Sequence, residues 1–141
     1  MDLLKRSLHK GFIDKHMVSS IYDPQMIINK PEKKEFFLNT LQSELESCEE
    51  FFFSIAFITQ SGLSALKTQL SDLNQRGVKG KILTSTFLAF NKPEVFEDLL
   101  NIPNIDVRIS DKKGFHAKGY LFKQSNYQPV VLVNFFLEEN V

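Results

Sequence analysis

The feature that most constrains the fold is an alternation of strand-like and helix-like stretches in the middle of the chain. The run FFFSIAF at residues 51–57 is apolar apart from one serine and has the length of a strand, which predicts a central strand covered on both faces. Leucines at helical spacing follow over residues 60–76, up to Gly77, and residues 78–84 form a second strand candidate. This order predicts a βαβ unit with parallel strands and a right-handed crossover.

The same alternation continues toward the C-terminus. Pro93 opens a second helix candidate, which ends near Leu100. Further strand candidates are residues 105–109, 115–122 and 130–133, the last two joined by a polar hairpin turn. We therefore expect an α/β fold in which a mixed, largely parallel sheet lies between two helical layers, a three-layer α/β/α arrangement.

The chain of 141 residues has room for one ordinary domain. We divide this domain into an N-terminal helix with its connector, residues 1–30, and an α/β core, residues 31–141. The first part has apolar residues at helical spacing over residues 2–14, followed by turn-forming prolines. The core opens with a helix that we expect to start at Pro31 or Glu32.

Charge is balanced over the whole chain but not along it. Lys and Arg together number 17, as do Asp and Glu, so no overall field attracts the protein to nucleic acid or to an anionic membrane. Residues 32–50 hold two basic against six acidic residues, and residues 76–123 hold nine basic against five acidic. This unevenness has two interpretations, a local anion site in the C-terminal half or two ordinary solvated faces.

Amino-acid composition limits the class of protein and the cellular compartment in which it works. Hydrophobic residues make up 43% of the chain and charged residues 24%, which excludes global disorder. Cys48 is the single cysteine, so no intrachain disulfide forms and a reducing, cytoplasmic setting fits best. No apolar stretch reaches the roughly 18 residues of a membrane span, and the N-terminal MDLLKRSLHK has charges where a signal peptide is apolar. We expect neither a secreted nor an integral membrane protein.

Among the three histidines, only His116 has informative neighbours. In FHAKGYLF, residues 115–122, the period of a strand places His116 and Lys118 on one face, about 7 Å apart along the strand. Such a pair suits a phosphodiester, since Lys118 would neutralise the non-bridging oxygens while His116 attacks phosphorus and forms a phosphohistidine. The competing interpretation is a pair of solvated residues without chemistry, because this spacing is common by chance.

Hydroxyl groups near strand ends are further candidates. Thr84 and Ser85 follow a predicted strand and are candidates for phosphate binding at the carboxyl edge of the sheet, or plain caps of the strand. Residues 59–62, TQSG, open a helix whose N-terminus attracts phosphate, with simple N-capping as the alternative. Most of the 14 phenylalanines fall in periodic apolar runs and are assigned to the core rather than to base stacking. Cys48 is expected to be a packed, unreactive thiol.

FHAKGYLF resembles the His-x-Lys motif of the phospholipase D superfamily. Longer runs extend the likeness over residues 11–122: HKGFIDK, ELESCEEFFFSIAFIT, GVKGKILTSTFLAFNKPEVFEDLL and NIDVRISDKKGFHAKGY. The chain is similar to the phospholipase-D-like domain found at the N-terminus of certain bacterial superfamily 2 DNA helicases and restriction-type proteins. The resemblance implies a nuclease-type phosphodiesterase that needs no metal or cofactor, with His116 as nucleophile and Lys118 as phosphate ligand.

The same resemblance implies that the chain is one half of a site, because the superfamily builds its active site from two such motifs. The other half would come from a second copy in a homodimer, or from a following domain of a longer chain that also holds an ATP-dependent helicase domain. The family pattern has an Asp five residues after the Lys, where this chain has Lys123, and a Gly-Ser-x-Asn element, where it has VNFFL with Asn134 as the remaining phosphate-binding candidate. These differences favour an alternative, a catalytically inactive module that binds DNA or dimerises for a helicase.

Overall fold

The computed structural model describes residues 10, 14, 16, 27, 29–34, 36–86, 92–125 and 129–133. By its internal contacts the chain divides into two units, residues 1–40 and residues 41–141. The helix predicted over residues 2–14 falls almost wholly outside the described residues and stays a prediction. The elements are the 3-10 helix η2 (Pro31–Lys33), the helices α2 (Phe37–Ser47), α3 (Gln60–Gln75) and α4 (Pro93–Leu100), and the strands β1 (Cys48–Ile55), β2 (Lys79–Ser85), β3 (Ile105–Ser110), β4 (Lys118–Gln124) and β5 (Pro129–Val133).

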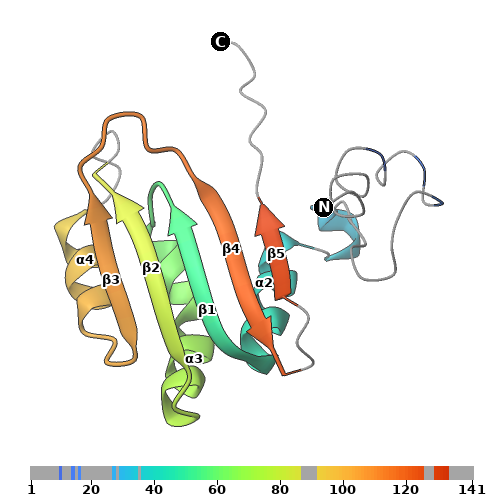
Figure 1. The fold of residues 1–141 in the computed structure, drawn as a ribbon, viewed down its shortest axis with the longest axis horizontal. Coiled ribbons are helices and arrows are strands. Elements are labelled where there is room, and N and C mark those ends of the chain that lie inside the picture. Colours follow the sequence, from blue (N-terminus) through green and yellow to red (C-terminus); the bar gives the residue numbers. More distant parts are fainter. Residues whose placement is uncertain are drawn as a thin grey trace. The chain divides into compact units, whose positions relative to one another are not determined.

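The five strands form one sheet in the order β3-β2-β1-β4-β5 (Figure 1). β1, β2 and β3 are parallel, whereas β4 runs antiparallel to β1 and β5 antiparallel to β4. The central position expected for the 51–57 run and the parallel β1–α3–β2 unit are therefore confirmed. The sheet is mixed, as expected, but it is parallel only over three strands. The chain enters β4 at the edge where β1 ends, so it must run back along β1.

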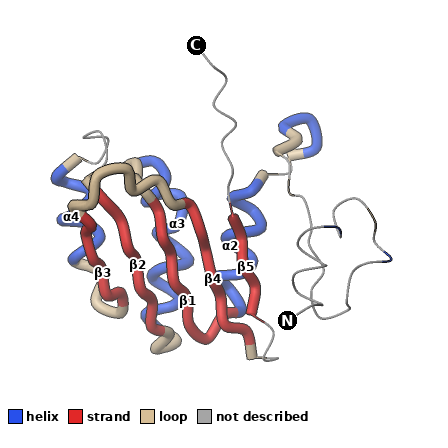
Figure 2. The backbone as a smooth tube through the Cα atoms, turned by 45° about the horizontal axis from the view of Figure 1, so that its top comes forward, coloured by secondary structure: helices blue, strands red, loops and turns tan. Residues whose placement is uncertain are grey.

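Helices α2, α3 and α4 lie on the same face of the sheet (Figures 1 and 2). The side chains that β1 turns toward them, Phe51 and Phe53, are 1% and 2% exposed, whereas Phe52 on the opposite face is 37% exposed. The prediction that this run is covered on both faces is therefore wrong for the described part of the chain. The described elements form two layers, and a second helical layer, as expected for α/β/α, is not among them.

An aromatic cluster fills the space between the sheet and the helices. The rings of Phe51 and Phe53 have their centroids 4.8 Å apart, and Phe122 on β4 meets Phe53 edge-on at 5.7 Å. Gly80 on β2 pairs with Phe51, and the Phe51 ring lies where a side chain at residue 80 would stand. A Cβ at Gly80 would be 2.6 Å from Cε2 of that ring and closer still to Cζ and Cε1. The missing side chain of Gly80 is therefore part of how the core packs.

The first helix of the core begins later than expected. Residues 31–33 form the separate 3-10 turn η2, and Lys34 follows with a φ of 55°, a left-handed conformation that ends the turn. Helix α2 begins at Phe37, whose backbone N–H donates to Oδ1 of Asn29 at 2.7 Å. The expected start at Pro31 is wrong, because the left-handed residue separates the proline from the helix.

Candidate functional site

Four strands meet at one edge of the sheet. β1, β2 and β3 end there, and β4 begins there because it runs antiparallel to β1 (Figure 1). In open α/β sheets, ligands bind outside the carboxyl ends of the parallel strands. Lys118, the first residue of β4, pairs with Ile55, the last residue of β1, so the pair of His116 and Lys118 lies at this edge.

The side chains of His116 and Lys118 touch. Nζ of Lys118 lies 2.9 Å from Nε2 of His116. An ammonium group has only donors, so it makes Nε2 the acceptor and leaves the ring hydrogen on Nδ1. The strand was expected from residue 115, but β4 begins at Lys118 and His116 precedes it. A regular strand spaces the backbone positions of two such residues about 7 Å apart, and the two side chains bridge that distance.

An aromatic ring holds the Lys118 side chain from another direction. Nζ of Lys118 lies 5.5 Å from the centroid of the Phe57 ring, which follows the end of β1. The face of an aromatic ring attracts a cation, so this contact and the histidine fix the ammonium group. Lys118 is half-buried while His116 is exposed. The imidazole is therefore accessible to a large substrate.

The backbone around the pair is fixed by hydrogen bonds through Ala56. The N–H of Ala56 donates to the carbonyl of Ala117 at 2.8 Å, which ties the residue between His116 and Lys118 to the end of β1. Oγ of Ser85 donates to the carbonyl of Ala56 at 2.8 Å in the interior. The ends of β1 and β2 and the start of β4 are therefore joined at one residue.

Thr84 and Ser85 lie at the predicted edge of the sheet, but their side chains are buried, with 0% and 1% exposure. The Ser85 hydroxyl is engaged by Ala56, and Oγ1 of Thr84 is enclosed without a hydrogen-bond partner among the described residues. Their assignment as phosphate ligands stays a prediction, and the geometry shows Ser85 in a positioning role. Asn134, the third phosphate-binding candidate, lies outside the described residues.

The loop between β3 and β4 adds positive charge close to His116 in the chain. Lys112 and Lys113 in this loop are both exposed. The loop turns at Gly114, whose φ of 77° suits glycine, and the N–H of Phe115 donates to the carbonyl of Lys112 at 3.4 Å. The loop therefore carries two exposed ammonium groups within four residues of the imidazole in the sequence.

The TQSG stretch caps helix α3. Oγ1 of Thr59 accepts a hydrogen bond from the N–H of Gly62 at 3.1 Å, the usual N-cap geometry. Nε2 of Gln60 donates to Oδ2 of Asp98 on α4 at 2.9 Å. The simpler of the two interpretations, N-capping, is the one that the geometry shows.

Cys48 lies at the start of β1, at the opposite end of that strand from His116. Its side chain is 1% exposed, and burial raises its pKa to about 11, with Arg76 acting in the opposite direction. A protonated, enclosed thiol is a poor nucleophile. The expectation of a packed cysteine is confirmed, and its lack of reactivity stays a prediction that burial supports. Burial also raises the pKa of Tyr120 in β4.

Sequence reasoning missed the roles of Phe57 and Ala56. The signal for Phe57 was its place directly after a buried strand, where a side chain reaches the carboxyl edge of the sheet. No sequence pattern identifies Ala56, because it acts through its backbone N–H and carbonyl groups. Within the described ranges, no three His, Cys, Asp or Glu side chains come together as a metal site requires. None of the described helices has the length and apolar character needed to cross a bilayer.

A comparison with protein-family models and with curated proteins finds no match for this chain.

Proposed function

We propose that the chain is a phospholipase-D-like half-domain of a DNA helicase or restriction-type protein, that it cleaves DNA without a metal ion, and that it acts in the cytoplasm. The observation that carries this proposal is the 2.9 Å contact between the His116 imidazole and the Lys118 ammonium group at the carboxyl edge of the sheet. The resemblance of FHAKGYLF to the His-x-Lys motif supports it.

The chemistry follows from the tautomer that the contact requires. Nε2 of His116 has the lone pair, so it can attack phosphorus once a substrate phosphate takes its place beside Lys118. The bond from phosphorus to the leaving oxygen breaks, and that oxygen takes a proton from a general acid. Water then attacks the phosphohistidine: its oxygen bonds to phosphorus, the P–N bond breaks, and the group that acted as the acid takes the proton of the water, which restores the imidazole. Lys118 neutralises the charge that develops on the non-bridging oxygens.

The general acid belongs to the second half-site. A second copy in a homodimer, or a second half-domain in a longer chain with an ATP-dependent helicase domain, would supply it. Two histidines that face each other across one cleft would give the two proton-transfer roles to equivalent groups. On this proposal a single copy binds DNA but does not complete turnover.

A second candidate function is an inactive module that binds DNA or pairs subunits. The observation that favours it is the burial of Thr84 and Ser85, whose hydroxyls face the interior instead of a bound phosphate. Lys123 stands where the family pattern has Asp and is exposed on β4. A cation in place of that carboxylate also favours the inactive module. This candidate predicts salt-sensitive DNA binding without turnover.

The test is hydrolysis of bis(p-nitrophenyl) phosphate and of labelled DNA in excess EDTA, with the oligomeric state measured by light scattering. His116→Ala should abolish turnover because it removes the nucleophile, while His16→Ala, a change of another exposed histidine, should not. Lys118→Met, which should lower turnover, and Lys67→Met, a change of an exposed lysine on α3, form a second matched pair.

Turnover that EDTA abolishes, or that survives His116→Ala, would contradict the proposal. A dimer that binds DNA without turnover, and loses affinity on Lys112→Gln, would identify the inactive module instead.

A further inference from the structure

The face of the sheet opposite the helices has an apolar half and a charged half. Residues paired in register stand side by side on one face. On one side Phe52 of β1 pairs with Leu121 of β4, which pairs with Val131 of β5. On the other side Phe52 pairs with Lys81 of β2, which pairs with Asp106 of β3. An aromatic ring therefore stands at the boundary between the two halves. We call this surface the open face.

The Phe52 ring is accessible. Among the described phenylalanines of the sheet it alone lies on the open face, at 37% exposure. Ser54 and Gly119 pair next to it, and a Cβ at Gly119 would meet no atom within 4 Å. These two small residues therefore leave one side of the Phe52 ring uncovered.

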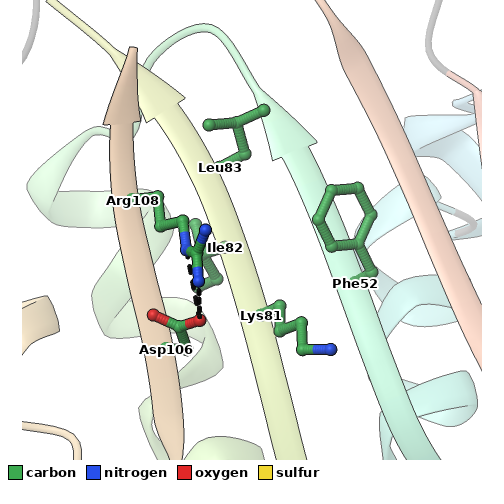
Figure 3. A pocket seen from close by; sticks show the side chains of 6 residues that line it. All are labelled: Phe52, Lys81, Ile82, Leu83, Asp106 and Arg108. Atoms are coloured by element: carbon green, nitrogen blue, oxygen red, sulfur yellow. Dashed lines mark hydrogen bonds and ion pairs between the residues drawn. The ribbon is translucent and has the colours of Figure 1, made fainter.

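A hollow of about 230 Å³ lies between Phe52 on β1 and Arg108 on β3, and Lys81, Leu83 and Asp106 also line it (Figure 3). Pockets for whole small molecules measure roughly 300–1,000 Å³. The hollow is smaller than that, so it suits one planar group of a longer molecule. Its wall combines an aromatic ring with a lysine and a planar guanidinium group.

The charge of the open face is positive. The two acidic residues that the register places on it each have a cation beside them: Oε1 of Glu50 lies 3.9 Å from Nζ of Lys81, and Oδ2 of Asp106 lies 3.3 Å from Nη2 of Arg108. Lys79 on β2 and Lys123 on β4 both pair in register with Glu50, and neither makes a salt bridge within the described part of the chain. The register places four cations on this face, Lys79, Lys81, Arg108 and Lys123, against the anions Glu50 and Asp106; the exposed Glu49 lies at the register shift beside Glu50, and the cations still outnumber the three anions.

We infer that the open face binds single-stranded DNA, with a base stacked on the Phe52 ring and the phosphates following the four cations. Proteins that bind single strands without sequence preference combine these two features, a basic surface and an aromatic ring that any base can stack on. A duplex hides the faces of its bases, so the surface selects unpaired strands. The choice of DNA over RNA rests on the proposed function.

The test is fluorescence anisotropy with a fluorescein-labelled oligothymidylate of about 20 nucleotides, in EDTA and in the His116→Ala background so that the strand stays intact. Phe52→Leu should weaken binding by roughly 5- to 140-fold, the range for loss of one stacked base, whereas Phe52→Tyr, which keeps an aromatic ring, should bind as the Phe52 protein does. Leu100→Ala is the control, since Leu100 is a 62% exposed apolar residue on α4 in the helical layer. A duplex of equal length should bind more weakly.

Salt dependence tests the phosphate contacts separately. Lys81→Gln should reduce the slope of log affinity against log salt by about 0.7, the value for one phosphate contact on a single strand. Lys67→Gln, which removes an exposed lysine of α3, should leave the slope unchanged.

Equal affinity of Phe52→Leu and the unsubstituted Phe52 protein, with circular dichroism showing both folded, would overturn the inference, and so would equal affinity for duplex. A dimer that Phe52→Glu converts to a monomer would show instead that the open face joins two copies. The rate at which His116→Ala hydrolyses bis(p-nitrophenyl) phosphate tests the proposed function alone, because that small substrate does not report binding of a strand. If Phe52→Leu did not weaken binding of the strand, the inference about the open face would fail and the hydrolysis results would be unaffected.

Discussion

Gly80→Ala should destabilise the protein, whereas Gly119→Ala should not. The added Cβ at residue 80 would lie 2.6 Å or less from three carbons of the Phe51 ring, where carbon atoms need about 3.5–4.0 Å. The ring would have to withdraw by roughly 1–1.5 Å. It has no space to do so, because Phe51 is 1% exposed and its ring stands against Phe53 at 4.8 Å. Overpacking of this kind costs about 1–3 kcal/mol.

The opposite sign is expected at residue 119. A Cβ there meets nothing within 4 Å, and glycine inside a strand is about 0.5–1 kcal/mol less favourable than alanine. Urea unfolding followed by circular dichroism gives both values, since the chain has no Trp to report by fluorescence. Phe51→Leu should offset part of the loss in Gly80→Ala, because the shorter side chain leaves room for the methyl group. If both alanine variants unfold at the same urea concentration, the assigned contact between Phe51 and Gly80 is wrong.

Three further outcomes follow from buried polar groups. Ser85→Ala should cost about 1–3 kcal/mol in urea unfolding, because the Ala56 carbonyl loses its donor, and an unchanged midpoint would contradict this. Thr84→Val should be neutral or stabilising, because Oγ1 is enclosed without a partner in the described region, and a loss above about 1 kcal/mol would reveal one. The free energy of unfolding should fall as pH rises from about 9 toward 11, because the unfolded Cys48 thiol releases its proton first, and Cys48→Ala should remove about 2–3 kcal/mol of this fall. The raised pKa of Tyr120 acts in the same direction at higher pH, so its part of the fall should persist in Cys48→Ala.

The order of helices and strands was predictable because the local sequence of each element shows the spacing of apolar residues that its type requires. Gly77, with a φ of 72°, follows α3 as expected, and Pro93 begins α4. The exposure of Phe52 was not predictable, because three consecutive phenylalanines hide the alternation of a strand with one covered face. Phe52 differs from Phe51 in exposure because no described helix covers its face of the sheet. The antiparallel entry of β4 likewise depends on where a distant segment pairs, which no local pattern records.

The candidate site was predictable in its residues but not in its geometry. The His-x-Lys spacing singled out His116 and Lys118, and the structure brings them into contact. The strand period placed both side chains on one face, but it did not predict that β4 begins at Lys118, after His116. Its position before β4 and the ring of Phe57 under Lys118 both arise from the pairing of β4 with β1.

The pairing of β4 with β1 has a consequence for the order in which the chain folds. β1, α3 and β2 are consecutive, so their contacts close short loops, whereas Ile55 must find Lys118 across more than sixty residues. Closing the larger loop costs more chain entropy, which makes the β1–β4 pairing the slower step. During synthesis the parallel half emerges and can pair before β4 leaves the ribosome. Until that last pairing forms, the imidazole and the ammonium group belong to an unanchored segment, and the long free edge of β1 is exposed to pairing with other chains.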